Sequence, residues 1–564
     1  MFSVVCKLGA PFNGSEINQY KSLVPNYKYF DLLSYTTPLG DLHVLIKKCE
    51  QPSGLVKEFD LAASKFILFG TPFIPELKKD FYSQVDGFFV GIEITEQSVR
   101  FIRDPIGSRA FYYSEINHKL VFATEIKSFK CIEGFDLVPR REAIAEYLSF
   151  SFIPGEKTFI KDINEISLGA YLECGIQSTK QVDYCRYHEN EGQWDNLGLE
   201  ELKATFGQTL KSSKEICDKL VGSESVYFLS GGLDSSAVLA MACQSGDAAP
   251  KETLSVHFGE DLPNENEYID QMVDRYKTKH EYLEVTPKKF ICSIEEIFEH
   301  VDDPIGDPVV VPNYLMNQHI GDKRNFVFTG EGGDPCLGGP KNKAMLMANF
   351  YGPGFGDDSN NYLELSYLNS FKRGFDDLHL SIPEISAESI NRMVGFLYPY
   401  LRENRLTHFT NRIMLTNIKL KATSLIMPKV QKTTMAFGNM SVSPLYTRRF
   451  IEDSMKVPPN YKLMHGNEKY ILKLCMSDIV PNQIINRPKS GMRVPLRIWS
   501  SAELVSFYKD YLYSNKSLVK EWISFDYVKR LLSKNGGEDQ PTRIGLKLWM
   551  IISFFHYLKN ITNK

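Results

Sequence analysis

Val226-Tyr-Phe-Leu-Ser-Gly-Gly-Leu-Asp-Ser-Ser-Ala-Val-Leu-Ala240 joins an apolar, β-prone run to a helix-forming run through glycine, serine and aspartate. The pattern predicts a strand over Val226–Leu229, a turn over Ser230–Ser236 and a helix that includes Ala237–Ala242. Glycines in such a turn let the backbone approach a ligand closely. The start of the helix offers unpaired N–H groups, and the serines add hydroxyl donors. The stretch therefore predicts an anion-binding turn.

Asp234 inside this turn would be repelled by a bare phosphate, which indicates a bridging cation such as Mg²⁺. The turn is not a Walker A loop, because such a loop ends in Gly-Lys-Ser/Thr. The nearest match elsewhere, Gly155-Glu156-Lys157-Thr158, has glutamate inside the pattern. Ser230–Ser236 resembles the pyrophosphate-binding loop of the ATP pyrophosphatases, which cleave ATP to AMP and pyrophosphate; an ordinary turn without a ligand is the alternative. The resemblance implies that ATP contacts come from Leu229, Ser230, Gly231, Gly232, Asp234, Ser235 and Ser236.

The composition is that of a globular protein with more than one domain. The chain has 564 residues, 43% of them hydrophobic and 24% charged, and a net charge of −4. This balance gives no electrostatic reason to expect nucleic acid or an anionic membrane as a partner. No start of the signal-peptide type, no membrane-spanning run and no CxxC pair among the ten cysteines is visible. We therefore expect a cytoplasmic protein with reduced thiols.

The first 130 residues or so contain short β-prone runs separated by turns, which predicts an antiparallel sheet in a layered α+β domain. The runs are Leu42–Ile46, Phe66–Phe69, Phe88–Ile94, Val99–Ile102 and Lys119–Ala123. Three pieces here resemble the glutaminase domain of the asparagine synthetase family. They are Asp86-Gly87-Phe88-Phe89, Arg103-Asp104-Pro105-Ile106-Gly107-Ser108-Arg109 and Phe122-Ala123-Thr124-Glu125-Ile126-Lys127. The resemblance implies an α+β sandwich of the N-terminal-nucleophile (Ntn) type over residues 1–190.

The catalytic part of that glutaminase domain is missing from the sequence. The family uses an N-terminal cysteine, exposed when Met is removed, whose own amine acts as the base. Position 2 holds Phe2, and the amine of Cys6 is locked in a peptide bond. The family segments that grip glutamine have no counterpart before Asp86. We therefore predict a domain without glutaminase activity, followed by a polar linker at Tyr184–Asn196 and a second domain over residues 200–564.

From Leu202 onward, helical and strand patterns alternate, which predicts an α/β doubly wound parallel sheet of the ATP-pyrophosphatase kind. The predicted helices are Leu202–Val221, Glu267–Tyr276 and Ile291–Val301, and the further strands are Thr253–Phe258, Tyr282–Val285 and Phe326–Thr329. Ligands on such sheets bind at the carboxyl ends of the strands. The turn Ser230–Ser236, Phe258-Gly259-Glu260 and Gly330-Glu331-Gly332-Gly333-Asp334 all fall at such ends.

Asp334 would bring a second carboxylate to the predicted phosphate site. Two acids around a triphosphate indicate a shared Mg²⁺, so Asp234 and Asp334 are the candidate metal ligands. An aspartate that serves only turn geometry is the alternative. The resemblance implies additional ATP contacts from His257, Gly330, Glu331 and Gly332.

Three later segments also resemble the synthetase half of the family. They are Asp302-Asp303-Pro304-Ile305-Gly306-Asp307-Pro308, Lys429-Val430-Gln431-Lys432-Thr433-Thr434-Met435-Ala436 and Arg487-Pro488-Lys489-Ser490-Gly491-Met492-Arg493-Val494-Pro495. Lys489 belongs to a Pro/Gly-rich loop, where a cation could neutralise pyrophosphate or stabilise a tetrahedral acyl transition state. Lys489 and Lys429 are the candidate catalytic residues, and a solvated surface lysine is the alternative for each.

The departures from the family pattern bear on the substrate. Pro335-Cys336 follows Asp334 where asparagine synthetases have Glu-Leu. Met440 and Val442 stand where the family has Glu and Arg, and a pocket without those charges is expected to take a different substrate. The segment Lys341–Ile390 has no clear counterpart, and we expect a helical cap or part of an enlarged pocket.

The resemblance implies an ATP-dependent carbon–nitrogen ligase that uses ATP and Mg²⁺ to activate a small-molecule or peptide carboxylate as an acyl-adenylate. Without a glutaminase, the amine is free ammonia or a group on the substrate itself. The altered pocket favours ring closure within one molecule, as in β-lactam synthetases and lasso-peptide cyclases. A macrolactam cyclase would need a precursor peptide and its leader protease as partners. A non-catalytic regulatory descendant is the third hypothesis.

Overall fold

The computed structural model describes residues 2–562 except 24–28, 49–55, 76–80, 117–118, 177, 222–224, 245–249, 261, 263, 322–325, 340, 353–360, 372–373, 488–491, 493, 497–502 and 535–542.

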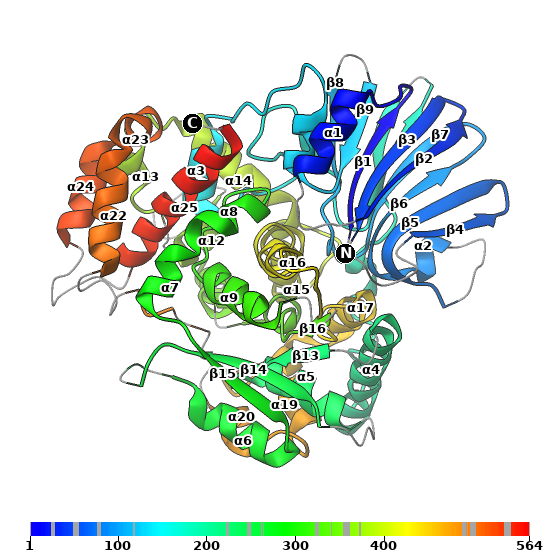
Figure 1. Cartoon of the computed structure of the whole chain (residues 1–564). Coiled ribbons are helices and arrows are strands. Elements are labelled where there is room, and N and C mark those ends of the chain that lie inside the picture. Colours follow the sequence, from blue (N-terminus) through cyan, green and yellow to red (C-terminus); the bar gives the residue numbers. More distant parts are fainter. Residues whose placement is uncertain are drawn as a thin grey trace.

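The N-terminal part of the chain forms two six-stranded antiparallel sheets, drawn in blue and cyan in Figure 1. The first sheet has the order β10 (Asn164–Glu165), β8 (Tyr112–Ile116), β9 (Lys119–Ala123), β1 (Phe2–Leu8), β3 (Gly40–Lys48), β2 (Tyr29–Thr37). The second has the order β12 (Thr179–Asp183), β11 (Ala170–Gly175), β7 (Ser98–Arg103), β6 (Asp86–Ile94), β5 (Ser64–Phe73), β4 (Val56–Leu61).

Alternate apolar side chains of the two sheets share one core. Val4 and Cys6 of β1 meet Val90 and Ile92 of β6 in it, as expected when two sheets pack face to face. Helices α1 (Gly14–Leu23) and η1 (Ile126–Cys131) contact each other and the outer side of the first sheet. This layered, antiparallel arrangement confirms the α+β prediction for the first part of the chain, whereas the Ntn-type assignment and the boundaries of both domains stay predictions.

Five parallel strands form the sheet in the lower part of Figure 1. Their order is β15 (Lys279–Glu284), β14 (Glu252–His257), β13 (Ser225–Phe228), β16 (Phe326–Phe328), β17 (Met440–Val442). The first four strands in chain order were predicted within one to three residues at each end. Strand β17 was not, because its three residues, Met440-Ser441-Val442, form no continuous apolar run of the kind that marks β16.

Helices surround this sheet and pack its apolar faces. They include α4 (Leu199–Leu220), α5 (Leu233–Cys243), α6 (Asn266–Tyr276), α9 (Val310–Ile320) and α10 (Gly333–Leu337). The predicted helix over 291–301 is instead two short helices, α7 (Pro287–Cys292) and α8 (Ile294–His300), and the Thr286 hydroxyl caps the first of them. The alternation of strands and helices confirms the predicted α/β class for this region.

A long helical segment lies at the centre of the molecule (Figure 1). It consists of α15 (Phe409–Thr416), a π-helical stretch η3 (Asn417–Ile426) and α16 (Met427–Met435). A π-helical stretch inside a helix often accompanies a functional site. Helix α16 contacts both α9 and β17, so it connects the parallel sheet to the rest of the fold.

The remaining helices complete the fold. The segment without a family counterpart is helical and contains α11 (Lys341–Tyr351), α12 (Tyr362–Phe371), α13 (Leu378–Ser381) and the start of α14 (Ala387–Leu401). The last elements are α17 (Arg448–Lys456), α18 (Pro459–Lys462), β18 (Leu463–Met464), β19 (Asn467–Glu468), α19 (Tyr470–Met476), α20 (Asn482–Asn486), α22 (Glu503–Ser514), α23 (Lys516–Trp522), α24 (Phe525–Lys534) and α25 (Ile544–Thr562). Within the described ranges, no helix has the length and apolar character needed to cross a bilayer.

Candidate active site

The order of the parallel strands reverses direction beside β13. From β13 the chain adds β14 and β15 on one side, then returns to place β16 and β17 on the other. The carboxyl ends of β13 and β16 are therefore neighbours at the switch point, where doubly wound sheets bind their ligands. The loops that leave these two ends are 229–232, which leads into α5, and 329–332, which leads into α10.

Glycines allow these two loops to touch. A Cβ added to Gly330 would lie 2.5 Å from the Ser235 nitrogen, and one added to Gly333 would lie 2.4 Å from Asp234 Oδ1. Both distances are shorter than any real side chain tolerates. Gly332 also has a φ of 108°, which only glycine adopts readily. The Gly-Glu-Gly-Gly-Asp sequence is therefore required by close packing against the start of α5.

The two predicted metal ligands converge on one cation, Lys469. The Lys469 Nζ lies 2.8 and 2.6 Å from the two carboxylate oxygens of Asp234 and 2.5 Å from Asp334 Oδ1. The Lys469 side chain is almost completely buried. The structure thus brings Asp234 and Asp334 together around a single positive charge, although they are 100 residues apart.

Sequence patterns did not identify Lys469 as a site residue. It follows the β18–β19 hairpin and has a φ of 56°, a left-handed conformation that is costly for a lysine and is often found at functional sites. Residues 466–469 contain no pattern that separates this lysine from a surface one. Only the tertiary structure, which brings Lys469 to Asp234 and Asp334, reveals its position.

Several hydroxyl, N–H and carbonyl groups of the predicted anion-binding turn already form hydrogen bonds within the protein. Ser230 and Ser235 hydrogen-bond through their hydroxyls at 3.0 Å, and Gly231 has a φ of 69°. Ser236 is fully buried, and its N–H donates to the Gly232 carbonyl. The N–H and carbonyl of Leu229 are engaged by Leu254 and by the Ser255 hydroxyl.

Arg487 contacts the backbone of the turn. Its guanidinium donates to the Gly231 carbonyl at 3.2 Å, pairs with Glu265 at 2.5 Å and lies 3.9 Å from the ring centre of Tyr268. Lys489 itself lies outside the described residues. His257 ends β14 and is half-buried, and its Nδ1 accepts the Gly259 N–H at 3.4 Å.

Lys429 is buried beside the second loop. Its Nζ donates to Asp307 Oδ2 at 3.0 Å and lies 3.8 Å from Glu331 Oε1. The structure therefore joins three predicted segments, those of Lys429, Glu331 and Asp307, through charged contacts. Lys429 is no solvated surface lysine, because its side chain is only 6% exposed.

The structure gives two of the segments noted in the sequence a different explanation. Met440 and Val442 are both buried residues of β17 and lie in the hydrophobic core with Phe326 and Phe328. Their apolar character is explained by packing of the sheet, so these positions carry no information about a substrate pocket. The family segment that 302–308 resembles lies near the active site, but Asp302 and Asp303 here accept backbone N–H groups of the N-terminal region and do not face the switch point.

The N-terminal region has no available thiol among its described cysteines. Cys6 is fully buried between the sheets, and burial raises the pKa of its thiol. Burial likewise raises the pKa of Cys131 and Cys174 to about 12 and of Cys185 to about 11. A thiol with such a pKa is almost never the reactive thiolate at neutral pH.

Fold and site together define the class of this protein. It joins an antiparallel sandwich to a doubly wound sheet whose switch point carries two glycine loops with facing carboxylates. Residues 221–556 match the asparagine synthase family model, and residues 74–185 match the glutamine amidotransferase domain model. Because the first match covers more than half of the chain, the chain belongs to the asparagine synthase family.

Individual relatives are distant. The chain is 24% identical to asparagine synthetase [glutamine-hydrolyzing] 1 of Bacillus subtilis over 484 residues, covering 80% of this chain and 74% of that protein. It is 20% identical to carboxyethyl-arginine beta-lactam-synthase of Streptomyces clavuligerus over 420 residues, covering 72% of this chain and 64% of that protein. A solved structure of an allosteric regulatory enzyme of purine biosynthesis matches 40% of this chain and 60% of its own at 10% identity with a TM-score of 0.22, too low to support an argument.

Proposed function

We propose that this protein is an ATP-dependent amide-bond-forming ligase. The observation that carries the proposal is the convergence of Asp234, Asp334 and Lys469 where β13 and β16 end. A helix N-terminus, a buried lysine and two carboxylates at one point fit a triphosphate with its divalent cation. Membership of the asparagine synthase family supports the same assignment.

Asp234 and Asp334 fit Mg²⁺, which proteins usually hold by one or two carboxylates together with substrate phosphates. Their oxygens already surround one cationic group, the Lys469 ammonium. No group of three or more His, Cys, Asp or Glu side chains in the described part of the chain forms an all-protein metal site. When bound, Mg²⁺ would neutralise phosphate charge.

The proposed reaction has two steps. An oxygen of the substrate carboxylate attacks the α-phosphorus of ATP, the bond to the β-phosphate oxygen breaks, and pyrophosphate leaves. An amine then attacks the acyl carbon, loses a proton and displaces AMP. The start of α5 and Lys469 would stabilise the departing pyrophosphate, and Lys429 and Lys489 are the candidates for charge stabilisation elsewhere in the site.

For the amine, we propose a group on the substrate itself, so that a ring closes within one small molecule or peptide. The buried thiols of the N-terminal region support an amine that does not come from glutamine. The similarity to a beta-lactam synthase agrees with ring closure. If the ring is a macrolactam, as in lasso peptides, a precursor peptide and its leader protease would be the partners.

The alternative is an asparagine synthetase-type enzyme that uses free ammonia. It is favoured by the 24% identity to a Bacillus subtilis asparagine synthetase over most of both chains. A non-catalytic descendant would keep the fold without turnover. The retained carboxylates and glycine loops argue against that third hypothesis.

ATP–pyrophosphate exchange tests the proposal. Purified protein is incubated with Mg²⁺, ATP, labelled pyrophosphate and a panel of acids that includes aspartate and carboxyethyl-arginine. At least one acid should support exchange, and Asp234→Asn should lower the rate at least about 100-fold because it removes a metal ligand. Asp526→Asn, at an exposed position of helix α24, is the matched control and should leave the rate unchanged. Absence of exchange with every acid would favour the non-catalytic descendant.

Analysis of the product then distinguishes an amine of the substrate itself from free ammonia. Ring closure predicts a product that has lost one water from the substrate, formed without ammonium. A product that requires ammonium and gains its nitrogen would instead support the asparagine synthetase-type reaction.

A further inference from the structure

The N-terminal region is connected to helix α16 by buried charges. Asp302 accepts the Ile126 N–H at 2.8 Å through Oδ1 and pairs with Lys432 through Oδ2. Lys432 also donates to the Thr124 carbonyl at 3.4 Å. Asp302 and Lys432 are each only 6% exposed. Thr124 and Ile126 follow β9, so this contact joins the first sheet to the synthetase part.

The same helix carries Lys429 three residues earlier, and side chains three positions apart lie on one side of a helix. Lys429 pairs with Asp307, five residues after Asp302, and approaches Glu331. Two lysines of α16 are thus paired with two aspartates of the segment 302–307. We call these four residues, Lys429, Lys432, Asp302 and Asp307, the α16 ladder. One of its ends contacts the N-terminal region and the other contacts the candidate active site.

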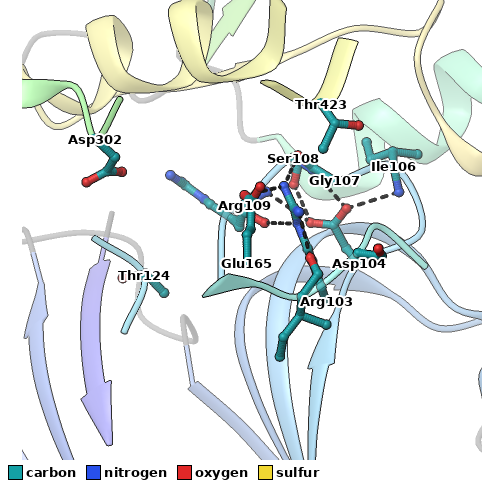
Figure 2. A network of polar contacts seen from close by, with 12 residues as sticks. Arg103, Asp104, Ile106, Gly107, Ser108, Arg109, Thr124, Glu165, Asp302 and Thr423 are labelled. Atoms are coloured by element: carbon teal, nitrogen blue, oxygen red, sulfur yellow. Dashed lines mark hydrogen bonds and ion pairs between the residues drawn. The ribbon is translucent and has the colours of Figure 1, made fainter. Parts of the chain in front are cut away.

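Further contacts form at the end of the α16 ladder that meets the N-terminal region. Asp303 accepts the Phe159 N–H at 2.8 Å, and Arg109 donates to the Met435 sulfur on α16. Figure 2 shows Arg109 extending away from the loop at Ser108 toward the side where Asp302 and Thr124 lie. The loop is rigid at its base, because the buried Asp104 carboxylate accepts the N–H groups of Ile106, Ser108 and Arg109.

A buried ion pair is seldom the most stable choice. Removing two charges from water costs several kcal/mol per ion, and apolar residues of similar volume are often as stabilising. Such pairs do determine which groups meet and in which register. The presence of the Asp302–Lys432 pair is therefore better explained by the position it gives to helix α16 than by a gain in stability.

We propose that Asp302 and Lys432 are positioning residues through which the N-terminal region fixes α16, and with it the contact of Lys429 with Glu331. This inference rests on the proposed function for the role of Lys429 and Glu331. It assigns to the N-terminal region a task other than glutamine hydrolysis: the region is a scaffold for the ligase site.

The test uses a nearly isosteric, uncharged version of the pair in the full chain, Asp302→Asn together with Lys432→Met. Asparagine keeps an acceptor for the Ile126 N–H, and the double variant removes both charges of the pair together, whereas Lys127 still lies beside the nearby buried carboxylate of Glu125. We expect the double variant to melt within a few degrees of wild type. Hydrogen exchange should be faster in peptides that cover 303–310 and 329–337. Pyrophosphate exchange should be at least tenfold slower, with an unchanged KM for ATP.

Lys432→Arg, which keeps the charge, should retain most of the exchange activity and fold even if the double variant does not. The control is Lys547→Met with Asp377→Asn. Lys547 of α25 pairs with both Asp376 and Asp377, and none of these ion pairs involves α16 or the switch point. The control should change neither hydrogen exchange at 329–337 nor the pyrophosphate exchange rate.

Unchanged hydrogen exchange at 303–310 and 329–337 in the double variant, with wild-type pyrophosphate exchange, would overturn the inference. The hydrogen-exchange arm needs no substrate. If the wild type shows no pyrophosphate exchange with any acid, the proposed function fails, and the hydrogen-exchange result alone still decides whether the ladder couples the two regions.

Discussion

At the scale of single residues, Lys469 is the side chain on which the site depends most. Its ammonium occupies the position between Asp234 and Asp334, at 2.6 and 2.5 Å from their nearest oxygens. The Asp234 side chain is mostly buried and that of Asp334 is partly exposed, and a shared cation offsets the repulsion between their two negative charges. Lys469 therefore supplies the counter-charge for both carboxylates, and under the proposed function the same two side chains would hold Mg²⁺.

Replacing Lys469 by methionine tests this role. The two carboxylates lose their counter-charge, so Lys469→Met should lower the melting temperature in EDTA, and added Mg²⁺ should raise it by more than in wild type. Pyrophosphate exchange should fall about 10- to 1000-fold, as expected when a charged transition-state contact is lost. Differential scanning fluorimetry and the exchange assay measure the two effects. Lys473→Met, one helical turn later, is the control, and an equal Mg²⁺ response in both variants would contradict the role.

Lys462 is another buried lysine, and we expect it to make stability depend on pH. Burial lowers the pKa of its ammonium to about 7, although Glu191 partly opposes the shift. The unfolded chain keeps the proton up to the ordinary lysine pKa, so between pH 7 and 10 the unfolded state binds more protons. Stability from this group therefore rises with pH over that range, by at most about 1.4 kcal/mol per pH unit.

Lys462→Met removes this titration. Urea unfolding at pH 7 and pH 9.5 should show a smaller increase in the free energy of unfolding for the variant than for wild type. The side-chain oxygen Oδ1 of Asn411 loses its lysine donor in the variant at both pH values. The difference between the free energies of unfolding at the two pH values is therefore unaffected by this loss. An identical increase in both proteins would show that Lys462 does not titrate in this range.

At the scale of elements, the site exists because the loop after β16 touches the start of α5. The contact is closest at Gly330, where a Cβ would lie 2.5 Å from the Ser235 nitrogen and 2.8 Å from the Asp234 carbonyl carbon. Both neighbours are backbone atoms of a helix, which cannot move aside as a flexible side chain can. The spacing of the two loops therefore determines the spacing of Asp234 and Asp334.

Gly330→Ala should separate these loops. We expect a loss of about 1–3 kcal/mol in stability from overpacking and a loss of pyrophosphate exchange larger than that of any surface variant. The control is Gly395→Ala in helix α14, where no atom lies within 4 Å of the new Cβ. That variant should be stabilised by about 0.4–1 kcal/mol. Chemical denaturation measures both, and full exchange activity in Gly330→Ala would refute the argument.

At the scale of the whole molecule, the N-terminal sandwich is attached to the synthetase part at several buried places. Besides the α16 ladder, Asp86 of β6 accepts the N–H groups of Arg448 and Arg449 at the start of α17. Such polar contacts between the two parts are lost if the sandwich moves. These contacts join the sandwich to the part of the chain that carries the candidate active site.

The whole chain should therefore hydrolyse no glutamine. Purified protein with glutamine, Mg²⁺ and ATP should release no more glutamate than a heat-treated sample, measured by coupled glutamate dehydrogenase. Cys6→Ala should leave this background and the pyrophosphate exchange unchanged, because Cys6 is a core residue with a raised thiol pKa. Steady glutamate release that disappears in Cys6→Ala would contradict the prediction.

Local patterns predicted the elements that carry strong periods. The strand–turn–helix around Asp234, three further parallel strands and five strands of the N-terminal sheets could be located from apolar runs and turn residues. The glycines of the 330–333 segment were also informative, because glycine repeated in one loop indicates close backbone approach. The class of the fold followed from the order of these elements.

The chain sequence alone thus determined the α+β and α/β layers and the two glycine loops, since both depend on interactions within a few residues. Tertiary structure decided which side chains meet. Lys469 and Asp234 are 235 residues apart, and no local pattern relates them. The same holds for Asp302, which resembled an active-site residue but contacts Ile126 and Lys432 instead. Long-range pairing of charges depends on the path of the whole chain, because burial and distance, and not residue type, set its energy.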